Sequence, residues 1–304
     1  MQEFTELLQD CLALYNGEKC DAQSCKLGLF CRGSGCDVGV CNSCMIHIQR
    51  HPSPKFPYSC KRITYHYVLR FFNRFASEIY YAMSRYKKEK LNTITNLNVV
   101  SLGCGPGSEV YGLIKAIRTR APHIHMNYQG YDKNEIWEGV QQLSKAKLAQ
   151  SGHSVEFYNK NLFLEFEGFQ DNHIDLLVLN YLLSDCQKFY TTDLDRKKFI
   201  DELAFFVVFN NVRNILFNDN SFIGYIGKID SGVKMMGLLI KSIRKWQQKV
   251  LLMGCYFSSD NYVPTTNWKC QPNGSLVFSG ISGHNLDDGI RRCQSKQILA
   301  YIEP

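Results

Sequence analysis

The segment Asn98-Val-Val-Ser-Leu-Gly-Cys-Gly-Pro-Gly-Ser-Glu109 joins a short apolar, β-branched run to three closely spaced glycines. An amphipathic run with Val110, Leu113 and Ile117 follows. This pattern predicts a buried parallel strand, a glycine turn and the first turn of a helix. Glycine lets the backbone approach a ligand where a Cβ would collide, and the free N–H groups of a new helix attract polar or anionic groups. We therefore expect a ligand-binding turn at residues 103–107.

Two classes of cofactor site use a glycine turn of this kind. A dinucleotide site requires G-x-G-x-x-G, and here Ser108 occupies the position of the third glycine. The chain has G-x-G-x-G instead, with a proline inside it and Glu109 after it, and this arrangement resembles motif I of class I S-adenosylmethionine-dependent methyltransferases. The resemblance implies that the amino-acid part of the cofactor is surrounded by Gly103, Cys104, Gly105 and Gly107. An ordinary βα turn, with glycines for tight packing, is the alternative.

Strand-like and helical stretches alternate along most of the chain. The strand-like stretches are residues 99–102, 128–132, 155–158, 174–180, 214–217, 249–257, 275–281 and 297–302. Helical patterns separate several of them, at residues 133–150, 195–211 and 231–247. This alternation indicates an α/β fold with a doubly wound, mostly parallel sheet. The resemblance implies a seven-stranded sheet of the Rossmann-like methyltransferase fold.

Polar residues follow the second and third of these strands. In a doubly wound sheet, ligands lie beyond the carboxyl ends of the strands. Asp132 ends the second strand, and its carboxylate offers two oxygens that suit the ribose hydroxyls of the cofactor. Lys133 beside it is a further cofactor-binding candidate, and the resemblance places Asn161 and Leu162 against the adenine. The alternatives are a helix N-cap for Asp132 and an ordinary turn residue for Asn161.

Asn180 and Tyr181 follow the fourth strand, where the resemblance places residues that face the transferred methyl group. Both are catalytic candidates, and Asn180 is also a candidate cofactor contact. Enzymes of this family that methylate amino groups of adenine or cytosine often carry Asn/Asp-Pro-Pro-aromatic here, and this chain has neither proline. Methylation of those amino groups is therefore not favoured. A general base is optional, because methyl transfer depends mainly on in-line placement of the nucleophile.

Residues 18–60 differ in composition from the rest of the chain. They contain seven of its 13 cysteines, separated by glycines and with few large aliphatic residues. Such a segment is too poor in apolar residues for a core of its own, whereas thiolates and histidines suit a tetrahedral zinc site. We predict a small metal-stabilised module with ligands among Cys20, Cys25, Cys31, Cys36, Cys41, Cys44, His47 and Cys60. An iron–sulfur cluster is the rival interpretation, and buried cysteines without a metal are the third.

Positive charge is concentrated in residues 50–90. This stretch carries ten Lys and Arg residues against two Glu residues, a net charge of +8, whereas the whole chain carries +7. We interpret it as a binding surface for nucleic acid, with RNA favoured over DNA. A solvated helix face is the alternative.

The chain divides by composition into three segments. They are an N-terminal helix with the cysteine-rich metal-binding module at residues 1–60, a basic aromatic linking helix at 61–90, and the S-adenosylmethionine-binding domain at 91–304. No apolar run is long enough to span a bilayer, and the first residues do not resemble a secretory signal. Together with the cysteine content, these features predict a cytoplasmic protein in a reducing compartment and no membrane association.

The sequence predicts an S-adenosylmethionine-dependent methyltransferase with an unidentified acceptor, either RNA or another nucleic acid, or else a small molecule or a protein. A non-catalytic cofactor-binding protein, whose metal module is an interaction domain, is the first alternative. A nicotinamide-dependent oxidoreductase is the second, and Ser108 argues against it. The sequence carries no signal of the oligomeric state.

Overall fold

The chain is built on one seven-stranded sheet with the strand order β3-β2-β1-β4-β5-β7-β6. In the computed structural model, the described residues are 1–18, 38–50, 60–166, 168–169, 173–190, 192–220, 231–246, 248–256, 275–281, 293 and 295–303. The strands are β1 (Asn96–Leu102), β2 (His125–Tyr131), β3 (Ser154–Tyr158), β4 (Leu176–Asn180), β5 (Asn214–Asn220), β6 (Lys249–Tyr256) and β7 (Ser295–Glu303).

The sheet is parallel except at β7. Strand β1 pairs in parallel with both β2 and β4, whereas β7 is antiparallel to β5 and to β6. The order therefore differs from the dinucleotide-binding order 3-2-1-4-5-6, because β7 is inserted between β5 and β6. The predicted α/β fold with a mostly parallel seven-stranded sheet is confirmed, and it is consistent with a Rossmann-like methyltransferase.

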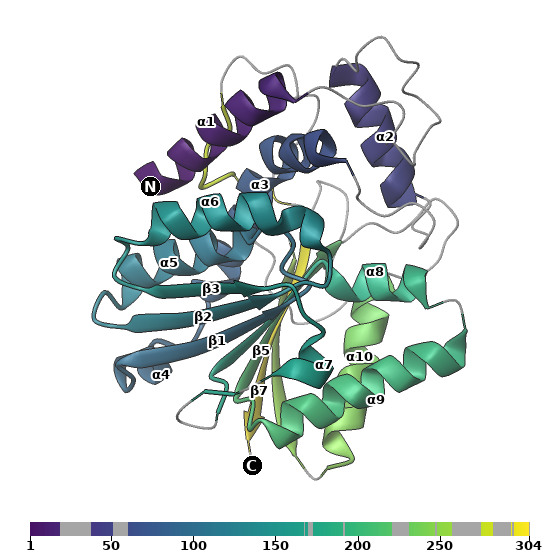
Figure 1. Ribbon diagram of the computed structural model, residues 1–304. Coiled ribbons are helices and arrows are strands. Elements are labelled where there is room, and N and C mark those ends of the chain that lie inside the picture. Colours follow the sequence, from purple (N-terminus) through teal and green to yellow (C-terminus); the bar gives the residue numbers. More distant parts are fainter. Residues whose placement is uncertain are drawn as a thin grey trace.

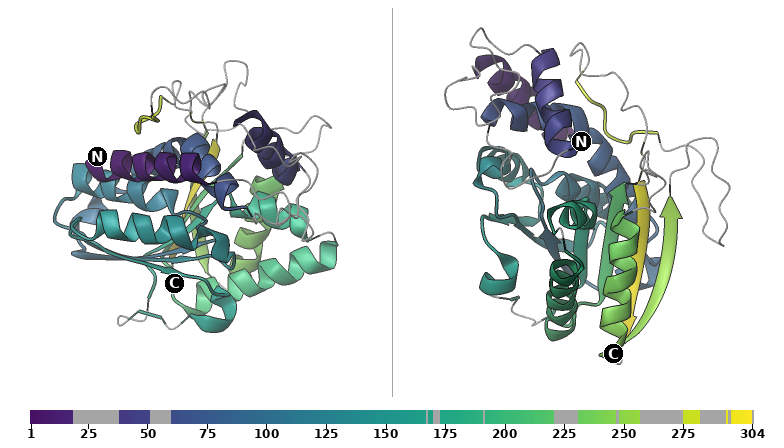
Figure 2. Two further views of the ribbon diagram at one scale, coloured as in Figure 1. Left: turned by 45° about the horizontal axis from the view of Figure 1, so that its top comes forward. Right: turned by 90° about the vertical axis from the view of Figure 1, so that its right-hand side faces the viewer.

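Helices cover both faces of the sheet (Figures 1 and 2). One face is covered by α1 (Gln2–Gly17), α3 (Lys61–Met83), α5 (Ser108–Arg120) and α6 (Glu138–Leu148). The other is covered by α8 (Leu182–Phe189), α9 (Asp193–Phe209) and α10 (Ser231–Arg244). The shorter or peripheral elements are α2 (Val38–Arg50), α4 (Lys88–Asn92), the 3₁₀ turn η1 (Glu135–Trp137) and α7 (Leu162–Glu165).

Alternate residues of the central strands enter two separate hydrophobic cores. In β1, Val99 belongs to the core under α1, α3 and α5, while Val100 belongs to the core under α9 and α10. This follows from the two-residue period of a strand, and both faces are apolar because both are covered. The side chains of the predicted apolar run before the glycine turn thus pack alternately into the two cores.

The N-terminal helices share the core of the sheet. Phe4 and Leu8 of α1 are buried with Phe72 of α3 and Tyr111 of α5 in a single cluster. The rings of Phe4 and Phe72 lie 5.7 Å apart between their centroids. The hydrophobic core thus extends across the predicted segment boundaries at residues 60 and 90.

The prediction of a strand at residues 275–281 is wrong. These residues lie beside α3 rather than in the sheet: the backbone N–H groups of Val277 and Phe278 both donate to Ser77 Oγ. Phe278 is buried against Phe4, with ring centroids 4.6 Å apart. An apolar run of this length is compatible with a strand and with a loop that covers the core. Here the backbone N–H groups bind Ser77 instead of a neighbouring strand, so the run forms a loop.

Within the described ranges, none of the helices combines the length and the apolar composition that crossing a bilayer requires.

Two helical glycines predict opposite effects of the same substitution. A Cβ at Gly112 of α5 would lie 2.4 Å from the carbonyl oxygen of Ala76 in α3, whereas a Cβ at Gly237 of α10 would meet nothing within 4 Å. We expect Gly112→Ala to lower the free energy of unfolding by about 1–3 kcal/mol, because α3 must move away. Gly237→Ala should raise it by about 0.5–1 kcal/mol, because alanine favours the helix. Urea unfolding measures both, and a stabilised Gly112→Ala protein would contradict the close approach of α3 to α5.

Candidate functional site

The glycine turn between β1 and α5 has the backbone that its sequence predicts. Gly103, Gly105 and Gly107 all have positive φ, at 60°, 51° and 81°, and Gly107 is the N-cap of α5. A side chain at two of these positions would also collide: a Cβ at Gly103 would lie 2.7 Å from Leu182, and one at Gly107 would lie 2.6 Å from Phe157. The three glycines are therefore required by conformation and, at two positions, by space.

Asp132 holds this turn in place. Its Oδ2 accepts a hydrogen bond from the N–H of Gly105 at 2.9 Å, and its Oδ1 accepts one from the N–H of Asn134 at 2.8 Å. Burial raises the pKa of Asp132, and the two N–H groups partly offset this effect. The predicted N-cap alternative is not what the structure shows, because Asn134 caps η1 through a bond from the Ile136 N–H.

Two residues that the sequence did not single out complete the turn. Gln141 of α6 donates from Nε2 to the carbonyl oxygen of Gly105 at 2.7 Å, so both backbone groups of Gly105 are bound to side chains. The ring of Trp137 would lie 3.8 Å from a Cβ at Gly105 and is in ring contact with Tyr67 of α3. Both lie in the first helical elements after β2, η1 and α6, so their order in the chain could have indicated them.

Asn180 and Tyr181 lie at the same edge of the sheet as the glycine turn. Strand β1 pairs with β2 and β4 at its last residues, so the ends of these strands are adjacent. Tyr181 has φ 57°, an uncommon value for a residue with a side chain, and its ring lies 4.3 Å from that of Phe75. Strained residues of this kind cluster at functional sites. Here the strained backbone accompanies the contact of the tyrosine ring with α3.

A buried carboxylate of α3 organises this end of β4. Glu78 is fully buried, and its Oε2 accepts hydrogen bonds from the Tyr181 hydroxyl at 2.9 Å and from Asn218 Nδ2 at 3.1 Å. Asn218 Nδ2 also donates to Asn180 Oδ1 at 2.8 Å, and Arg74 Nε lies 3.7 Å from Glu78 Oε1. Glu78 thus fixes both catalytic candidates, although it stands about a hundred residues before them.

A second buried carboxylate lies under the turn. Glu109 Oε1 accepts hydrogen bonds from Ser101 Oγ at 2.6 Å and from the Tyr128 hydroxyl at 2.8 Å. Burial raises the pKa of Glu109, while these bonds and one with Asn180 oppose the rise. Because Glu109 is fully buried, its role is to hold Asn180, β1 and β2 together rather than to contact a ligand.

The predicted adenine contacts lie farther out. Asn161 is exposed, and its Oδ1 accepts a hydrogen bond from the N–H of Phe163 at 3.2 Å, which is the turn role considered as its alternative. Leu162 begins α7, and Lys133 is exposed beside Asp132. These residues follow β3 and β2 at the same edge of the sheet, so a role in cofactor binding stays a prediction.

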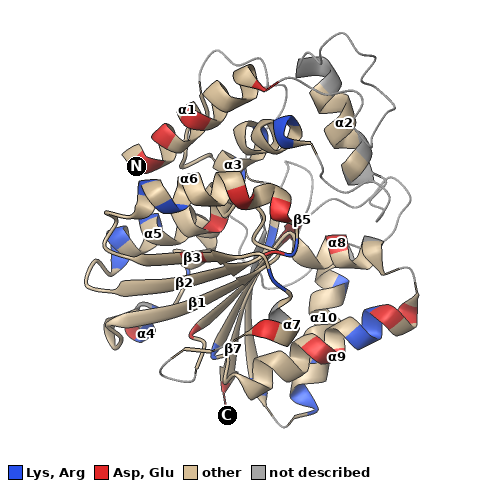
Figure 3. Ribbon diagram, in the orientation of Figure 1, with Lys and Arg blue, Asp and Glu red and all other residues tan. Residues whose placement is uncertain are grey.

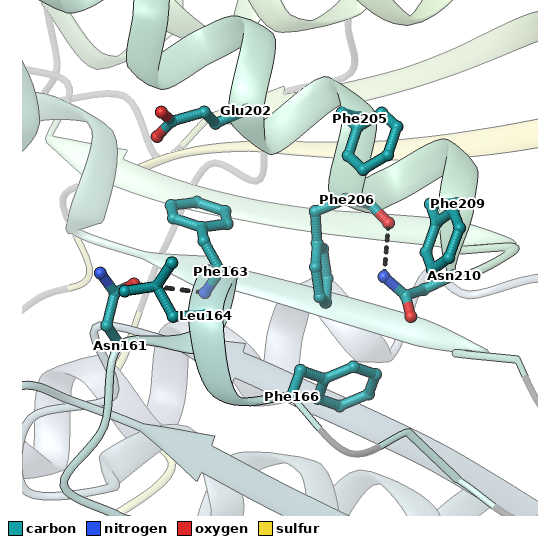
Figure 4. A pocket seen from close by; sticks show the side chains of 9 residues that line it. All are labelled: Asn161, Phe163, Leu164, Phe166, Glu202, Phe205, Phe206, Phe209 and Asn210. Carbon is teal, nitrogen blue, oxygen red and sulfur yellow. Dashed lines mark hydrogen bonds between the residues drawn. The ribbon is translucent and has the colours of Figure 1, made fainter.

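A separate aromatic groove of about 420 Å³ lies between α7 and α9 (Figure 4). Among the predicted cofactor residues whose side chains the structure describes, Asn161 alone lines it. Its walls are Phe163, Leu164, Phe166, Glu202, Phe205, Phe206, Phe209 and Asn210. The groove is therefore distinct from the edge of the sheet that carries the glycine turn and Asp132.

The described residues do not support the predicted metal site. No group of three or more His, Cys, Asp or Glu residues that could hold a metal occurs in the part of the chain that the structure describes. Cys41 and Cys44, predicted as a knuckle-like pair, both lie on α2, where Cys41 is buried in the main core and Cys44 in a cluster with Met45. Cys60 is half-buried at the start of α3. The remaining predicted ligands, or their side chains, lie outside the described residues: Cys20, Cys25, Cys31, Cys36 and His47.

Comparison with known proteins gives a structural likeness only. No protein-family model matches the chain, and no curated protein matches its sequence. The plantazolicin methyltransferase BpumL in complex with SAH is similar with a TM-score of 0.43 at 10% identity, over 98% of this chain and 100% of that one.

Two further solved structures are similar to the same degree. Magnesium protoporphyrin IX methyltransferase (ChlM) from Synechocystis PCC 6803 with bound SAM has a TM-score of 0.41 at 14% identity, over 76% of this chain and 80% of that one. The bifunctional kinase-methyltransferase WbdD has a TM-score of 0.41 at 13% identity, over 86% of this chain and 45% of that one. These similarities are too weak to assign an activity, so the site itself must carry the argument.

Removing Glu78 should destabilise the fold. Glu78→Ala leaves the buried Arg74 without the one ion-pair partner that it has among the described residues and removes the acceptor of Tyr181 and Asn218. We expect the free energy of unfolding to fall by about 3–5 kcal/mol. Glu89→Ala, at an exposed position of α4, is the matched control and should change it by less than about 0.5 kcal/mol. Equal effects of the two substitutions in urea unfolding would contradict the described network.

Proposed function

We propose that this protein is an S-adenosylmethionine-dependent methyltransferase. The observation that carries the proposal is the glycine turn at the end of β1, whose three glycines have positive φ and which the Asp132 carboxylate holds from the end of β2. A side chain at any of these positions would strain the backbone or occupy the space beside it. A ligand can approach the backbone closely only where such side chains are absent. A glycine turn beside a carboxylate supports a ligand that has a small polar end and neighbouring hydroxyl groups, as S-adenosylmethionine has.

Residues of this chain would hold the cofactor in three places. The backbone of residues 103–107 would bind its amino-acid end. Asp132 would accept hydrogen bonds from the ribose, because each carboxylate oxygen, although bound to one N–H group, keeps a further lone pair. Asn161 and Leu162 would lie on the adenine side. When bound, S-adenosylmethionine supplies a sulfonium-activated methyl group.

Asn180 and Tyr181 would position the acceptor. The Tyr181 hydroxyl donates a hydrogen bond to Glu78. The lone pairs of its oxygen therefore remain free to accept a hydrogen bond from the attacking group of the methyl acceptor. Asn180 is fixed through Asn218 and Glu109. Such fixed groups favour in-line attack without a dedicated base. If no transfer occurs, the same residues describe a cofactor-binding protein.

The strand order favours this proposal over a nicotinamide-dependent oxidoreductase. The dinucleotide-binding order lacks the antiparallel strand that β7 inserts beside β5. Ser108, at the position of the third dinucleotide glycine, is buried at the first turn of α5.

Incubation with methyl-labelled cofactor and separated RNA, DNA, protein and small-molecule fractions would identify the acceptor class.

Metal binding remains a separate proposal. Zinc, or an iron–sulfur cluster, would require ligands from outside the described residues, since Cys41 and Cys44 lie in different hydrophobic clusters. Elemental analysis of the purified chain decides between a metal and buried thiols.

Binding of S-adenosylhomocysteine, the product of transfer, tests the cofactor proposal. We expect wild-type protein to bind it and Gly105→Ala to bind at least about tenfold more weakly, because the added methyl group enters the cradle and disfavours φ 51°. Gly152→Ala is the matched control: it places the same methyl group at φ 80° with nothing within 4 Å. Isothermal titration calorimetry that gives equal affinities for wild type and Gly105→Ala would remove the turn from the site.

We also propose nucleic-acid binding through residues 50–90, but fewer of their basic side chains are available for it than the sequence suggested. Several arginines of this segment make internal contacts: Arg62 lies over the ring of Tyr15, Arg70 donates to Asn42, and Arg85 donates to Gln297. In Figure 3, Lys and Arg residues are spread over α3, α5, α6 and α9 rather than gathered on one element. Phosphate contacts would therefore fall to exposed lysines such as Lys61.

Salt dependence tests this surface. If RNA contacts Lys61 and Lys87, replacing both with Gln should reduce the slope of log affinity against log salt concentration by up to about 1.4–1.8, at roughly 0.7–0.9 per phosphate. Lys198→Gln, an exposed lysine of α9, is the control for loss of charge alone. Filter binding that detects no RNA at low salt, or an unchanged slope, would show that these lysines are solvated surface residues that do not contact RNA.

A further inference from the structure

Arg74 is a buried cation whose hydrogen-bonding capacity is unused. Its side chain is 10% exposed, and its Nε is sealed from solvent without a hydrogen-bond partner. Glu78 Oε1 is 3.7 Å from Nε, which is beyond hydrogen-bond distance. Within the described chain, Arg74 therefore makes one long ion pair and no hydrogen bond through its guanidinium.

Three aromatic rings fix this guanidinium. Its central carbon lies 4.9 Å from the ring centroid of Phe75, 5.5 Å from that of Phe71 and 5.7 Å from that of Tyr181. Such contacts orient an arginine and tolerate its charge, but they satisfy none of its five N–H donors. A buried charge without hydrogen bonds is costly, so the arrangement stabilises a ligand that accepts those bonds.

The position of Arg74 connects it to the candidate site. Tyr181, whose ring it contacts, directly follows Asn180 at the end of β4. The next residue, Leu182, would lie 2.7 Å from a Cβ at Gly103, so the glycine turn and this segment touch. An anion bound to Arg74 would thus lie at the edge of the sheet where the cofactor is proposed to bind.

We propose that Arg74 binds the carboxylate of a ligand at this edge of the sheet. The planar, forked guanidinium matches a carboxylate through two parallel hydrogen bonds, which a lysine cannot provide. Two ligands could carry that carboxylate: S-adenosylmethionine, at its amino-acid end, or the acceptor. The proposal rests on the methyltransferase function proposed above and identifies the residue that selects a carboxylate.

The first arm of the test compares S-adenosylmethionine with decarboxylated S-adenosylmethionine, which lacks only that carboxylate. If Arg74 binds the cofactor, Arg74→Gln should weaken binding of S-adenosylmethionine by about 10- to 100-fold in calorimetry. It should leave the affinity for the decarboxylated form unchanged. Arg70→Gln removes the same charge one turn earlier on α3, where the guanidinium donates to Asn42, and should change neither affinity.

The second arm uses benzoate as a carboxylate probe on protein saturated with S-adenosylhomocysteine. If Arg74 serves the acceptor, wild-type and Arg70→Gln proteins should bind benzoate in ligand-observed NMR titrations, and Arg74→Gln should bind it at least about tenfold more weakly. The two forms of the cofactor should then bind Arg74→Gln as they bind wild type. Either pattern supports the proposal and names the source of the carboxylate.

Two results would overturn it: unchanged affinities of Arg74→Gln for all three ligands, or an equal loss for both forms of the cofactor. Arg74→Lys keeps the charge beside Glu78 and replaces Arg74→Gln if that variant does not fold; it should lose S-adenosylmethionine or benzoate affinity several-fold. Wild-type protein that binds neither form of the cofactor would instead reject the proposed function itself, before any Arg74 variant is compared.

Discussion

The hydrogen bond from the Gly105 N–H to the Asp132 carboxylate is the contact on which the candidate site depends. It joins the ends of β1 and β2, and Gln141 binds the other backbone group of Gly105. A turn with three positive-φ glycines is entropically costly to order, because glycine loses more backbone freedom than other residues. A charged acceptor and a side-chain amide offset that cost.

A second constraint arises from α3, which brings charge to an apolar interface. Glu78 and Arg74 lie among Phe71, Phe75 and Tyr181, where burial penalises both charges. Hydrogen bonds from Tyr181 and Asn218 satisfy the carboxylate, whereas the buried Nε of Arg74 has no hydrogen-bond partner among the described residues. The pair therefore contributes less to stability than apolar side chains of the same size would, which is typical of groups retained for binding or orientation rather than for folding.

Local patterns predicted what local interactions determine. The strand at residues 99–102, the glycine turn and the helix after it follow from a continuous stretch of sequence, and Asp132 follows from its place after the next strand. Glu78 could not be found this way, because its partners Tyr181 and Asn218 are 103 and 140 residues away. The spacing of the cysteines is ambiguous for another reason: three residues place Cys41 and Cys44 one helical turn apart as readily as on one metal ion.

The burial of α2 gives this helix a role that does not depend on a metal. Cys44, Met45 and Ile48 of α2 pack against Phe71 and Phe75, the rings that surround Arg74, and the same cluster reaches Tyr181. Helix α2 therefore packs against the aromatic residues of α3 that lie beside the candidate acceptor site. Because these contacts are apolar, they lower the polarity around the guanidinium and strengthen any charge-assisted bond that it forms. Selectivity for the ligand would thus arise jointly from α2, α3 and the residue after β4.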